Sequence, residues 1–175
     1  IARATPNEAH DALAALERAL DDVRIVTQNV DGLHQRAGSA DVVELHGSVA
    51  THRHGWLGTP VALAGPPDPL RPPALFARPN VVLFFESIPL ATWLEAEDLV
   101  DALEEGDVLL VVGTSCAVAP ANTLPRAAYV RGATIVEVNP RPALGHLDAL
   151  PLAGDAGPIL SRIVEATRAL RNRPR

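Results

Sequence analysis

The stretch that decides the fold is Val108-Leu109-Leu110-Val111-Val112-Gly113-Thr114-Ser115. Five consecutive apolar residues, without polar residues between them, are typical of a strand buried on both faces of a parallel sheet. The turn of small residues that follows lets backbone amides and hydroxyls come close to a phosphate or a ribose. The stretch therefore predicts a parallel strand with a ligand site at its carboxyl end.

Similar runs of β-branched residues occur elsewhere, and stretches with helical periodicity separate them. We expect strands at 23–27, 81–85, 108–112 and 134–138, and helices at 91–105, 120–131 and 158–170. An earlier helix follows a capping box predicted at Thr5-Pro6-Asn7-Glu8. We expect these helices to turn Leu20, Leu94 and Leu170 inward. Because strands and helices alternate, the predicted class is α/β with an open, mostly parallel, Rossmann-like sheet.

The segment from His46 to Asn80 does not follow this alternation of strands and helices. Seven of the chain's 16 prolines fall between Pro60 and Pro79, and no strand or helix period is evident there. So long a stretch without elements of its own predicts an inserted module, which we expect to be poorly ordered. The predicted organisation is a sheet domain of residues 1–46 and 81–175 and a small inserted module of residues 47–80.

Composition narrows the class of protein. With 175 residues, 47% of them hydrophobic and 21% charged, the chain has the balance of one soluble globular domain. The net charge of −6 argues against a nucleic-acid partner, and no apolar run is long enough to span a membrane. We expect a cytoplasmic protein. Since the chain opens at Ile1 and holds no Met, we expect it to be processed or part of a longer protein.

Polar residues gather where the expected strands end, which is where open α/β sheets bind ligands. Two interpretations remain open for each group. Thr27-Gln28-Asn29-Val30-Asp31-Gly32 is suited either to gripping a polar ligand or to capping a short helix. His46 is suited to proton transfer near neutral pH, but a histidine at the end of an apolar run is often structural. Asn139 is suited to ribose hydroxyls or to a turn.

The order and spacing of these blocks resemble the sirtuin family of NAD-dependent protein deacylases over nearly the whole chain. The blocks are Thr27 to His34, Arg36-Ala37-Gly38, Glu44-Leu45-His46-Gly47, Val112-Gly113-Thr114-Ser115, Val138-Asn139-Pro140 and Gly154-Asp155-Ala156-Gly157. The sequence around Pro120-Ala121 and Leu124-Pro125 is most similar to that of the desuccinylase-like branch of bacteria and mitochondria.

The resemblance implies a chemistry and a set of roles. NAD is the cofactor, an acyl-lysine protein or peptide is the substrate, and the products are free lysine, nicotinamide and acyl-ADP-ribose, with no metal in the bond changes. The implied catalytic residues are the general base His46 with Asn29 and Asp31. The implied cofactor contacts are Gln28, Asn29, Asp31, Gly113, Thr114, Ser115, Asn139, Asp155 and Ala156. Backbone pairing with the substrate peptide is implied at Val82, Phe84 and Glu86.

The sequence departs from the family in three ways. The family's first strand and its glycine-rich phosphate turn have no counterpart after Ile1, so we expect an N-terminally incomplete chain. The four cysteines of the family's zinc module are absent, because Cys116 is the only Cys; we expect no zinc, and we expect His52 and His54 to be surface residues. The family's Phe-Gly-Glu reads Phe84-Phe85-Glu86, where Phe85 either narrows the substrate tunnel or packs in the core.

The departures leave two alternatives to deacylation. The first is a noncatalytic module, or a degenerate relative, that binds NAD or ADP-ribose without turnover. The second is an NAD hydrolase or ADP-ribosyltransferase, which would use the same pocket with a different acceptor.

Overall fold

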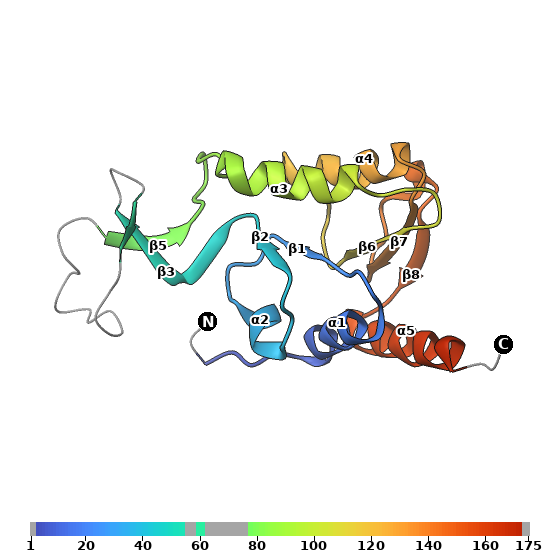
Figure 1. Ribbon diagram of the computed structural model, residues 1–175. Helices are drawn as coiled ribbons and strands as arrows, with labels where there is room; N and C mark the ends of the chain where they lie inside the picture. Colours follow the sequence, from blue (N-terminus) through green and yellow to red (C-terminus); the bar gives the residue numbers. More distant parts are fainter. Residues whose placement is uncertain (1–2, 55–58, 62–76, 173–175) are drawn as a thin grey trace.

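The computed structural model describes residues 3–54, 59–61 and 77–172. Its helices are α1 (Glu8–Ala19), α2 (Leu33–Ala37), α3 (Leu90–Asp101), α4 (Leu124–Val130) and α5 (Ala156–Arg171), with 3-10 turns η1 (Ala121–Thr123) and η2 (Gly145–Leu147). Its strands are β1 (Ile25–Thr27), β2 (Val42–Glu44), β3 (Gly47–His54), β4 (Pro60–Val61), β5 (Ala77–Val81), β6 (Val108–Val112), β7 (Thr134–Asn139) and β8 (Leu150–Ala153). Figure 1 shows their arrangement.

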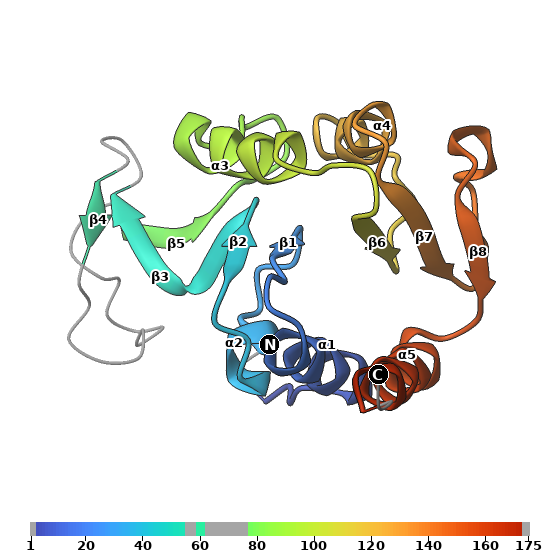
Figure 2. The same cartoon turned by 45° about the vertical axis from the view of Figure 1, so that its right-hand side comes forward.

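The parallel strands form the middle layer of an α/β fold, which confirms the predicted class. Strand β1 pairs with β2, and β6, β7 and β8 pair in that order, all in parallel. Among the described residues no pairing joins β1–β2 to β6–β7–β8, so the layer consists of two groups of strands. Helices α1 and α5 lie on one side of this layer and α3 and α4 on the other (Figure 2).

Two apolar clusters hold the layers together. On one face, α3 and α4 pack against the strands through a buried set that includes Val43, Leu45, Ala96, Val100, Val111, Ala128 and Ile135. On the other face, α1 and α5 pack against each other and against β7 through Ala12, Ala15, Leu16, Val138, Leu160 and Val164. Alternate residues of β6 join opposite clusters, as expected of a strand covered on both faces.

Most predicted elements are present, with shifted ends. The strand predicted at 108–112 is confirmed, and β7 extends the one predicted at 134–138 by one residue. The capping box lies two residues later than predicted: Asn7, not Thr5, is the N-cap, and its Oδ1 accepts the N–H groups of Ala9 and His10. An Asn side chain is the better cap here because the chain is extended at residue 7.

Three leucines predicted to point inward are exposed instead. Leu20 is 39% exposed because α1 ends before it, and its own backbone is extended. Leu94 and Leu170 are 46% and 62% exposed. At 100° per residue, Leu94 lies on the side of α3 opposite Ala96, and Leu170 lies well away from Val164 on α5. The apolar face of each helix is therefore narrower than the sequence pattern suggested.

The strand predicted at 81–85 is wrong. Strand β5 ends at Val81, and the chain then turns, with the N–H of Glu86 donating to the carbonyl of Leu83 at 3.0 Å. Phe85 has a φ of 71°, a left-handed conformation that a strand cannot contain. A run of apolar residues predicted a strand here, but the chain leaves the sheet before it.

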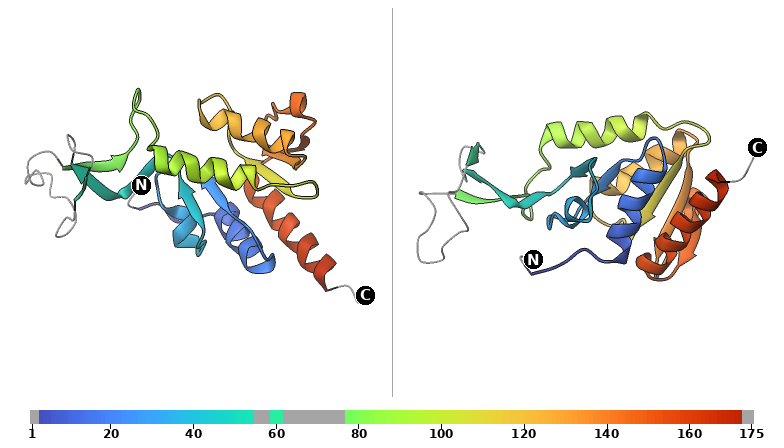
Figure 3. Two further views of the ribbon diagram at one scale, coloured as in Figure 1. Left: turned by 45° about the horizontal axis from the view of Figure 1, so that its top comes forward. Right: turned by 60° about the horizontal axis from the view of Figure 1, so that its bottom comes forward.

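The inserted segment has elements of its own in its described part, contrary to our expectation. Strand β3 pairs antiparallel with β4 and β5, in the order β4-β3-β5, at the end of the molecule away from β8 (Figure 3). These strands are rich in polar residues, so they lack the apolar alternation that marks a strand in a sequence. Pro79 is compatible with β5 because β5 is an edge strand. Residues 55–58 and 62–76 of the segment lie outside the described residues.

Candidate functional site

His46 lies between β2 and β3 and is fixed through its backbone and its ring. The N–H of its neighbour Leu45, which is 1% exposed, donates to the carbonyl of Thr27 at 2.9 Å. The carbonyl of His46 accepts the N–H of Val82 at 2.9 Å. The imidazole is half-buried, and its Nδ1 lies 3.0 Å from the carbonyl oxygen of Gln28. Because a carbonyl can only accept, this contact is a hydrogen bond when Nδ1 carries a proton, an arrangement that leaves the lone pair of the neutral ring on Nε2.

Gly47 allows the chain to turn directly after His46. Its φ is 75°, and a Cβ at this position would lie 2.0 Å from the carbonyl oxygen of Asn80. A side chain would therefore push β5 away from β3. Glycine at position 47 lets His46, β3 and β5 meet at one point.

The loop after β1 combines both interpretations offered for it. It forms local turns: the Oγ1 of Thr27 accepts the N–H of Asn29 at 3.1 Å, and the Oδ1 of Asp31 accepts the N–H of Leu33 at 3.0 Å. The side chain of Asn29 is exposed and makes no hydrogen bond with the described residues, so it is available to a ligand. Asp31 uses one carboxylate oxygen to begin α2 and is half-buried.

Thr114 connects the carboxyl ends of β1, β6 and β7. Its Oγ1 accepts the N–H of Cys116 at 3.1 Å and lies 3.4 Å from Nε2 of Gln28, while its carbonyl accepts Nδ2 of Asn139 at 2.7 Å. Gly113 continues the same edge, since its N–H donates to the carbonyl of Val138 at 2.9 Å. The structure therefore brings together Gln28, Gly113, Thr114 and Asn139, which the sequence placed on different strands.

The amino end of α5 completes this edge. Asp155 is its N-cap residue but makes no side-chain cap hydrogen bond, and Ala156 is the first helical residue. The N–H of Gly154 donates to the carbonyl of Asn139 at 3.2 Å, which holds the helix start beside β7. A helix start without a side-chain cap leaves backbone N–H groups for a ligand at the positive end of the helix. Ser115 is exposed at the same edge and makes no hydrogen bond with the described residues.

Sequence reasoning missed Glu137, a buried carboxylate behind this edge. Its side chain is 1% exposed and accepts the N–H of Ala143 at 2.9 and 3.0 Å and that of Leu144 at 2.8 Å. These bonds fix the loop that follows Asn139. A charged residue in an otherwise apolar strand was the signal that could have revealed it.

The residues predicted to bind the substrate peptide lie in the turn after β5, which begins beside His46, and they differ in exposure. Val82 is half-buried and hydrogen-bonded to His46. Phe84 and Phe85 are 95% and 107% exposed, so the expectation that Phe85 packs in the core is wrong. The turn directs both rings away from the protein because it has left the sheet. Glu86 is paired with Arg53 and Arg78, two residues that the sequence did not single out because no strand was predicted around them.

The histidines of the inserted segment are partly exposed. His52 and His54 lie two residues apart on β3, hence on one face of the strand, and both are half-buried. Within the described ranges, no three His, Cys, Asp or Glu side chains are grouped so that they could hold a metal ion. Cys116 is half-buried at the carboxyl end of β6, and burial raises the pKa of its thiol. No helix in the described part of the chain has the length and apolarity to cross a membrane.

Comparison with known proteins identifies relatives of the whole chain. Residues 1–56 match the Sir2 family. The NAD-dependent protein deacylase 2 of Pyrobaculum aerophilum is 44% identical over 180 residues, covering 99% of this chain and 71% of the relative. A solved complex of a mutant Sir2 homologue with ADP-ribose has a TM-score of 0.89 and 36% identity, covering 99% of this chain and 71% of the other.

A second structure carries a peptide. Sir2Af2 bound to a myristoylated histone peptide has a TM-score of 0.82 and 35% identity, and the match covers 96% of this chain and 74% of that one. The agreement of sequence and structure along nearly the full length of the chain leaves one assignment: the chain belongs to the Sir2 family, the sirtuins.

Proposed function

We propose that this protein removes acyl groups from lysine side chains of proteins, with NAD as cosubstrate and His46 as the general base. The observation that carries the proposal is the orientation of His46. Its Nδ1 is held by the carbonyl of Gln28, 3.0 Å away, in the same loop as Asn29 and Asp31. The relatives named NAD-dependent protein deacylases support the reaction.

The residues at the carboxyl edge of the strands fit NAD by their chemistry. Hydroxyl and amide groups of Thr114, Ser115 and Asn139 can exchange hydrogen bonds with ribose hydroxyls, and the uncapped start of α5 offers N–H groups beside Asp155. Gly113 lies at this edge with a φ of 63° and no atom within 4 Å of where a Cβ would be, so nothing there obstructs a ligand. The homologue solved with ADP-ribose supports this assignment.

NAD supplies the ribose carbon that receives the acyl oxygen as nicotinamide departs, and the protein's own residues supply the proton transfer and the orientation. His46 accepts a proton at Nε2 from a ribose hydroxyl, and the Gln28 carbonyl stabilises the resulting imidazolium through Nδ1–H. Asn29 offers a free side-chain amide, and Asp31 a carboxylate oxygen that α2 does not use. These two groups orient the nicotinamide end of the cosubstrate.

The substrate peptide, in this proposal, lies along Val82 and Phe84, next to His46. The N–H of Val82 is already bonded to His46, so the turn and the base are fixed relative to each other. The homologue solved with an acylated histone peptide supports a peptide substrate. The names of the relatives give a deacylase without its acyl group, so the desuccinylase-like branch remains a prediction.

We also propose that the protein holds no structural zinc. Cys116 is the only cysteine, and it lies in the turn that follows β6, so a four-cysteine site is impossible. Between Gly47 and Asn80 the sequence offers only His52, His54 and Asp68 as ligands. Metal analysis of protein purified without chelator should give far less than one zinc per chain. A stoichiometric zinc content would contradict the proposal.

The test of deacylation uses the longest product of the gene that contains this chain. We expect NAD-dependent deacylation of an acyl-lysine peptide by the unaltered protein and by His146→Ala, an exposed-histidine control on η2, but not by His46→Ala. Loss of a general base lowers the rate by about 10²–10⁴-fold. Equal activity of His46→Ala would contradict its role as base.

Two other outcomes identify the alternatives. Binding of ADP-ribose by calorimetry, without turnover of any acyl peptide, would indicate a noncatalytic binding protein. Release of nicotinamide at the same rate with and without acyl peptide would indicate an NAD hydrolase. Either result would replace the proposed function.

A further inference from the structure

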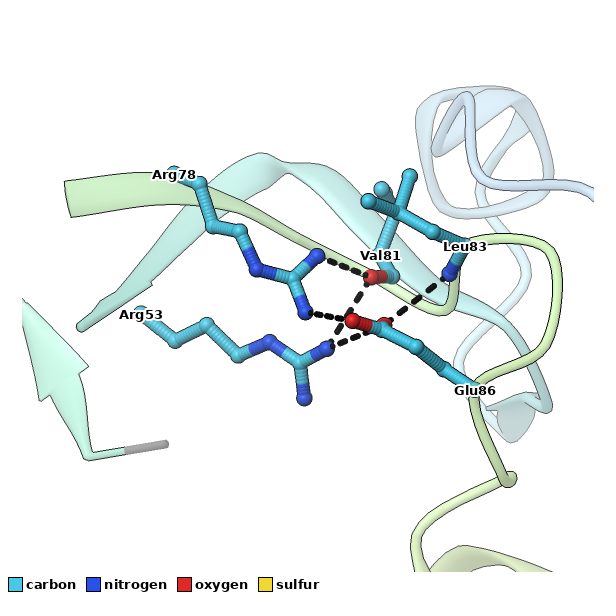
Figure 4. Close-up of polar contacts among 5 residues, drawn as sticks. All are labelled: Arg53, Arg78, Val81, Leu83 and Glu86. Carbon is cyan, nitrogen blue, oxygen red and sulfur yellow. Dashed lines mark hydrogen bonds and ion pairs between the residues drawn. The ribbon is translucent and has the colours of Figure 1, made fainter. Parts of the chain in front are cut away.

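The turn after β5 is held by a cluster of two arginines and one carboxylate (Figure 4). Arg78 of β5 donates to Oε1 of Glu86 at 2.6 Å, and Arg53 of β3 donates to Oε2 at 2.8 Å. The same arginines donate to the carbonyl of Val81 at 3.0 and 3.2 Å. Oε2 of Glu86 also accepts the N–H of Leu83 at 3.0 Å. Each carboxylate oxygen therefore has an arginine, and both arginines reach the strand end.

This cluster differs from an ordinary surface ion pair. The side chains of Arg53 and Arg78 are only 19% and 25% exposed, and that of Glu86 is 36% exposed. Arg78 uses both terminal nitrogens of its planar fork, one for the Val81 carbonyl and one for Glu86, whereas Arg53 donates to both from Nη2. The hydrogen bond from Arg78, the Leu83 N–H and the charges of Arg78 and Arg53 lower the pKa of Glu86 below its usual value.

The cluster lies at one end of a short backbone path that ends at His46. Gly47 is opposite Val81 in the β3–β5 ladder, and the next residue, Val82, donates its N–H to the carbonyl of His46 at 2.9 Å. The turn of residues 82–86 is thus fixed at its start by His46 and at its end by Glu86. Between these two points it presents Phe84 and Phe85 almost wholly to solvent, so packing does not hold it.

We propose that Glu86 is a positioning residue, through which Arg53 and Arg78 hold the turn of residues 82–86 so that its backbone offers the substrate peptide a fixed edge beside His46. The inference rests on the proposed function, because that function implies a substrate peptide bound along this turn. In this proposal the side chain of Glu86 bonds other groups of the protein and does not bind the substrate. The consequence is a specific one: the cluster sets the affinity for peptide and, because it has no bond to Thr114, Ser115 or Asn139, leaves the affinity for the cosubstrate unchanged.

The experiment replaces Glu86 by Gln, which keeps the shape and removes the charge. Charge-assisted hydrogen bonds are roughly twice as strong as neutral ones, so we expect the peptide KM to rise about tenfold. We expect the KM for NAD, and kcat at saturating peptide, to change less than about twofold. The peptide KM of the unaltered protein should rise with salt, whereas that of Glu86→Gln should not. Glu165→Gln, which neutralises an exposed carboxylate on α5, is the matched control.

Hydrogen exchange tests the cluster without any activity. By NMR, the amides of Leu83 and Val82 should exchange faster in Glu86→Gln, for Leu83 by about tenfold, and should be unchanged in Glu165→Gln. If the unaltered protein proves inactive, the proposed function fails. The exchange rates still test whether Glu86 holds the turn of residues 82–86. Unchanged exchange would overturn the proposal, and so would a fall in kcat with an unchanged peptide KM, because that pattern indicates only a smaller folded fraction.

Discussion

The Nδ1 of His46 lies 3.0 Å from the carbonyl oxygen of Gln28, a contact that connects the proposed base to the loop carrying Asn29 and Asp31. Because the carbonyl can only accept, we expect the neutral ring to carry its hydrogen on Nδ1. Nitrogen-15 NMR of histidine-labelled protein distinguishes the two tautomers, and His46→Ala identifies the signal. A ring with its hydrogen on Nε2 would contradict this geometry and leave no lone pair for a base on that atom.

The backbone of Phe85 is strained, and its side chain makes no packing interactions that compensate for this strain. Its φ of 71° is a left-handed conformation, which costs roughly 1–2 kcal/mol for a residue with a Cβ. The ring is fully exposed, so its removal loses no packing. Glycine increases the conformational entropy of the unfolded chain, which favours unfolding by about 0.4–1 kcal/mol. This offsets part of the stability gained from the relieved strain. We expect Phe85→Gly to raise the free energy of unfolding by about 0.5–1 kcal/mol, measured by urea denaturation.

Phe84 provides the matched control for this prediction. It is 95% exposed like Phe85, but its φ is not in the positive range. Phe84→Gly should therefore only gain flexibility in the unfolded state and should leave stability unchanged or lower. If both substitutions have the same effect, the conformation of Phe85 is not a source of strain.

The sequence predicted the parallel strands β1, β6 and β7 because their signal is local. The run from Val108 to Val112 is apolar throughout, and such a run needs cover on both faces wherever it lies. The short strands β2 and β8 were not predicted, since three residues, or four that include a proline, give no period. Their pairing with β1 and β7 is visible only in three dimensions. The strand predicted at 81–85 shows the reverse error, because hydrophobicity alone does not reveal where a strand ends.

The site was predictable where a motif is contiguous and unpredictable where distant residues meet. Thr27 to His34 identified its loop directly. By contrast, nothing in the sequence connects Arg53 and Arg78 to Glu86, because the two arginines are brought together by an antiparallel pairing of polar strands. The link between Gln28 and Thr114 likewise spans 86 residues of chain. Such contacts arise from the fold and are not encoded in local spacing.

Glu137 should be essential to the loop behind Asn139. Its buried carboxylate accepts backbone N–H groups of Ala143 and Leu144, and removing it leaves those donors without a partner in a dry site. We expect Glu137→Ala to lower the free energy of unfolding by about 2–4 kcal/mol, from lost hydrogen bonds and the cavity together. Urea denaturation measures this change. Glu165→Ala, at an exposed position of α5, should change stability by less than about 0.5 kcal/mol; equal losses in the two variants would contradict the role of Glu137.

His34 should make the fold less stable as the solution becomes mildly acidic. Burial, and then the charge of His10 from α1, lower its pKa below the usual 6.5, while Asp31 and Glu17 oppose this. The unfolded chain therefore takes up the proton more readily than the folded one, so stability is full above about pH 6.5 and falls as the pH drops toward the lower, folded pKa. The Nδ1 of His34 is buried without a partner among the described residues, so protonation there places a charge that nothing accepts. We expect the loss of unfolding free energy between about pH 7.5 and pH 5.5, measured in urea, to be smaller in His34→Gln than in the unaltered protein. His146→Gln, at an exposed position, should keep the full loss, and an undiminished loss in His34→Gln would assign the pH dependence to another group.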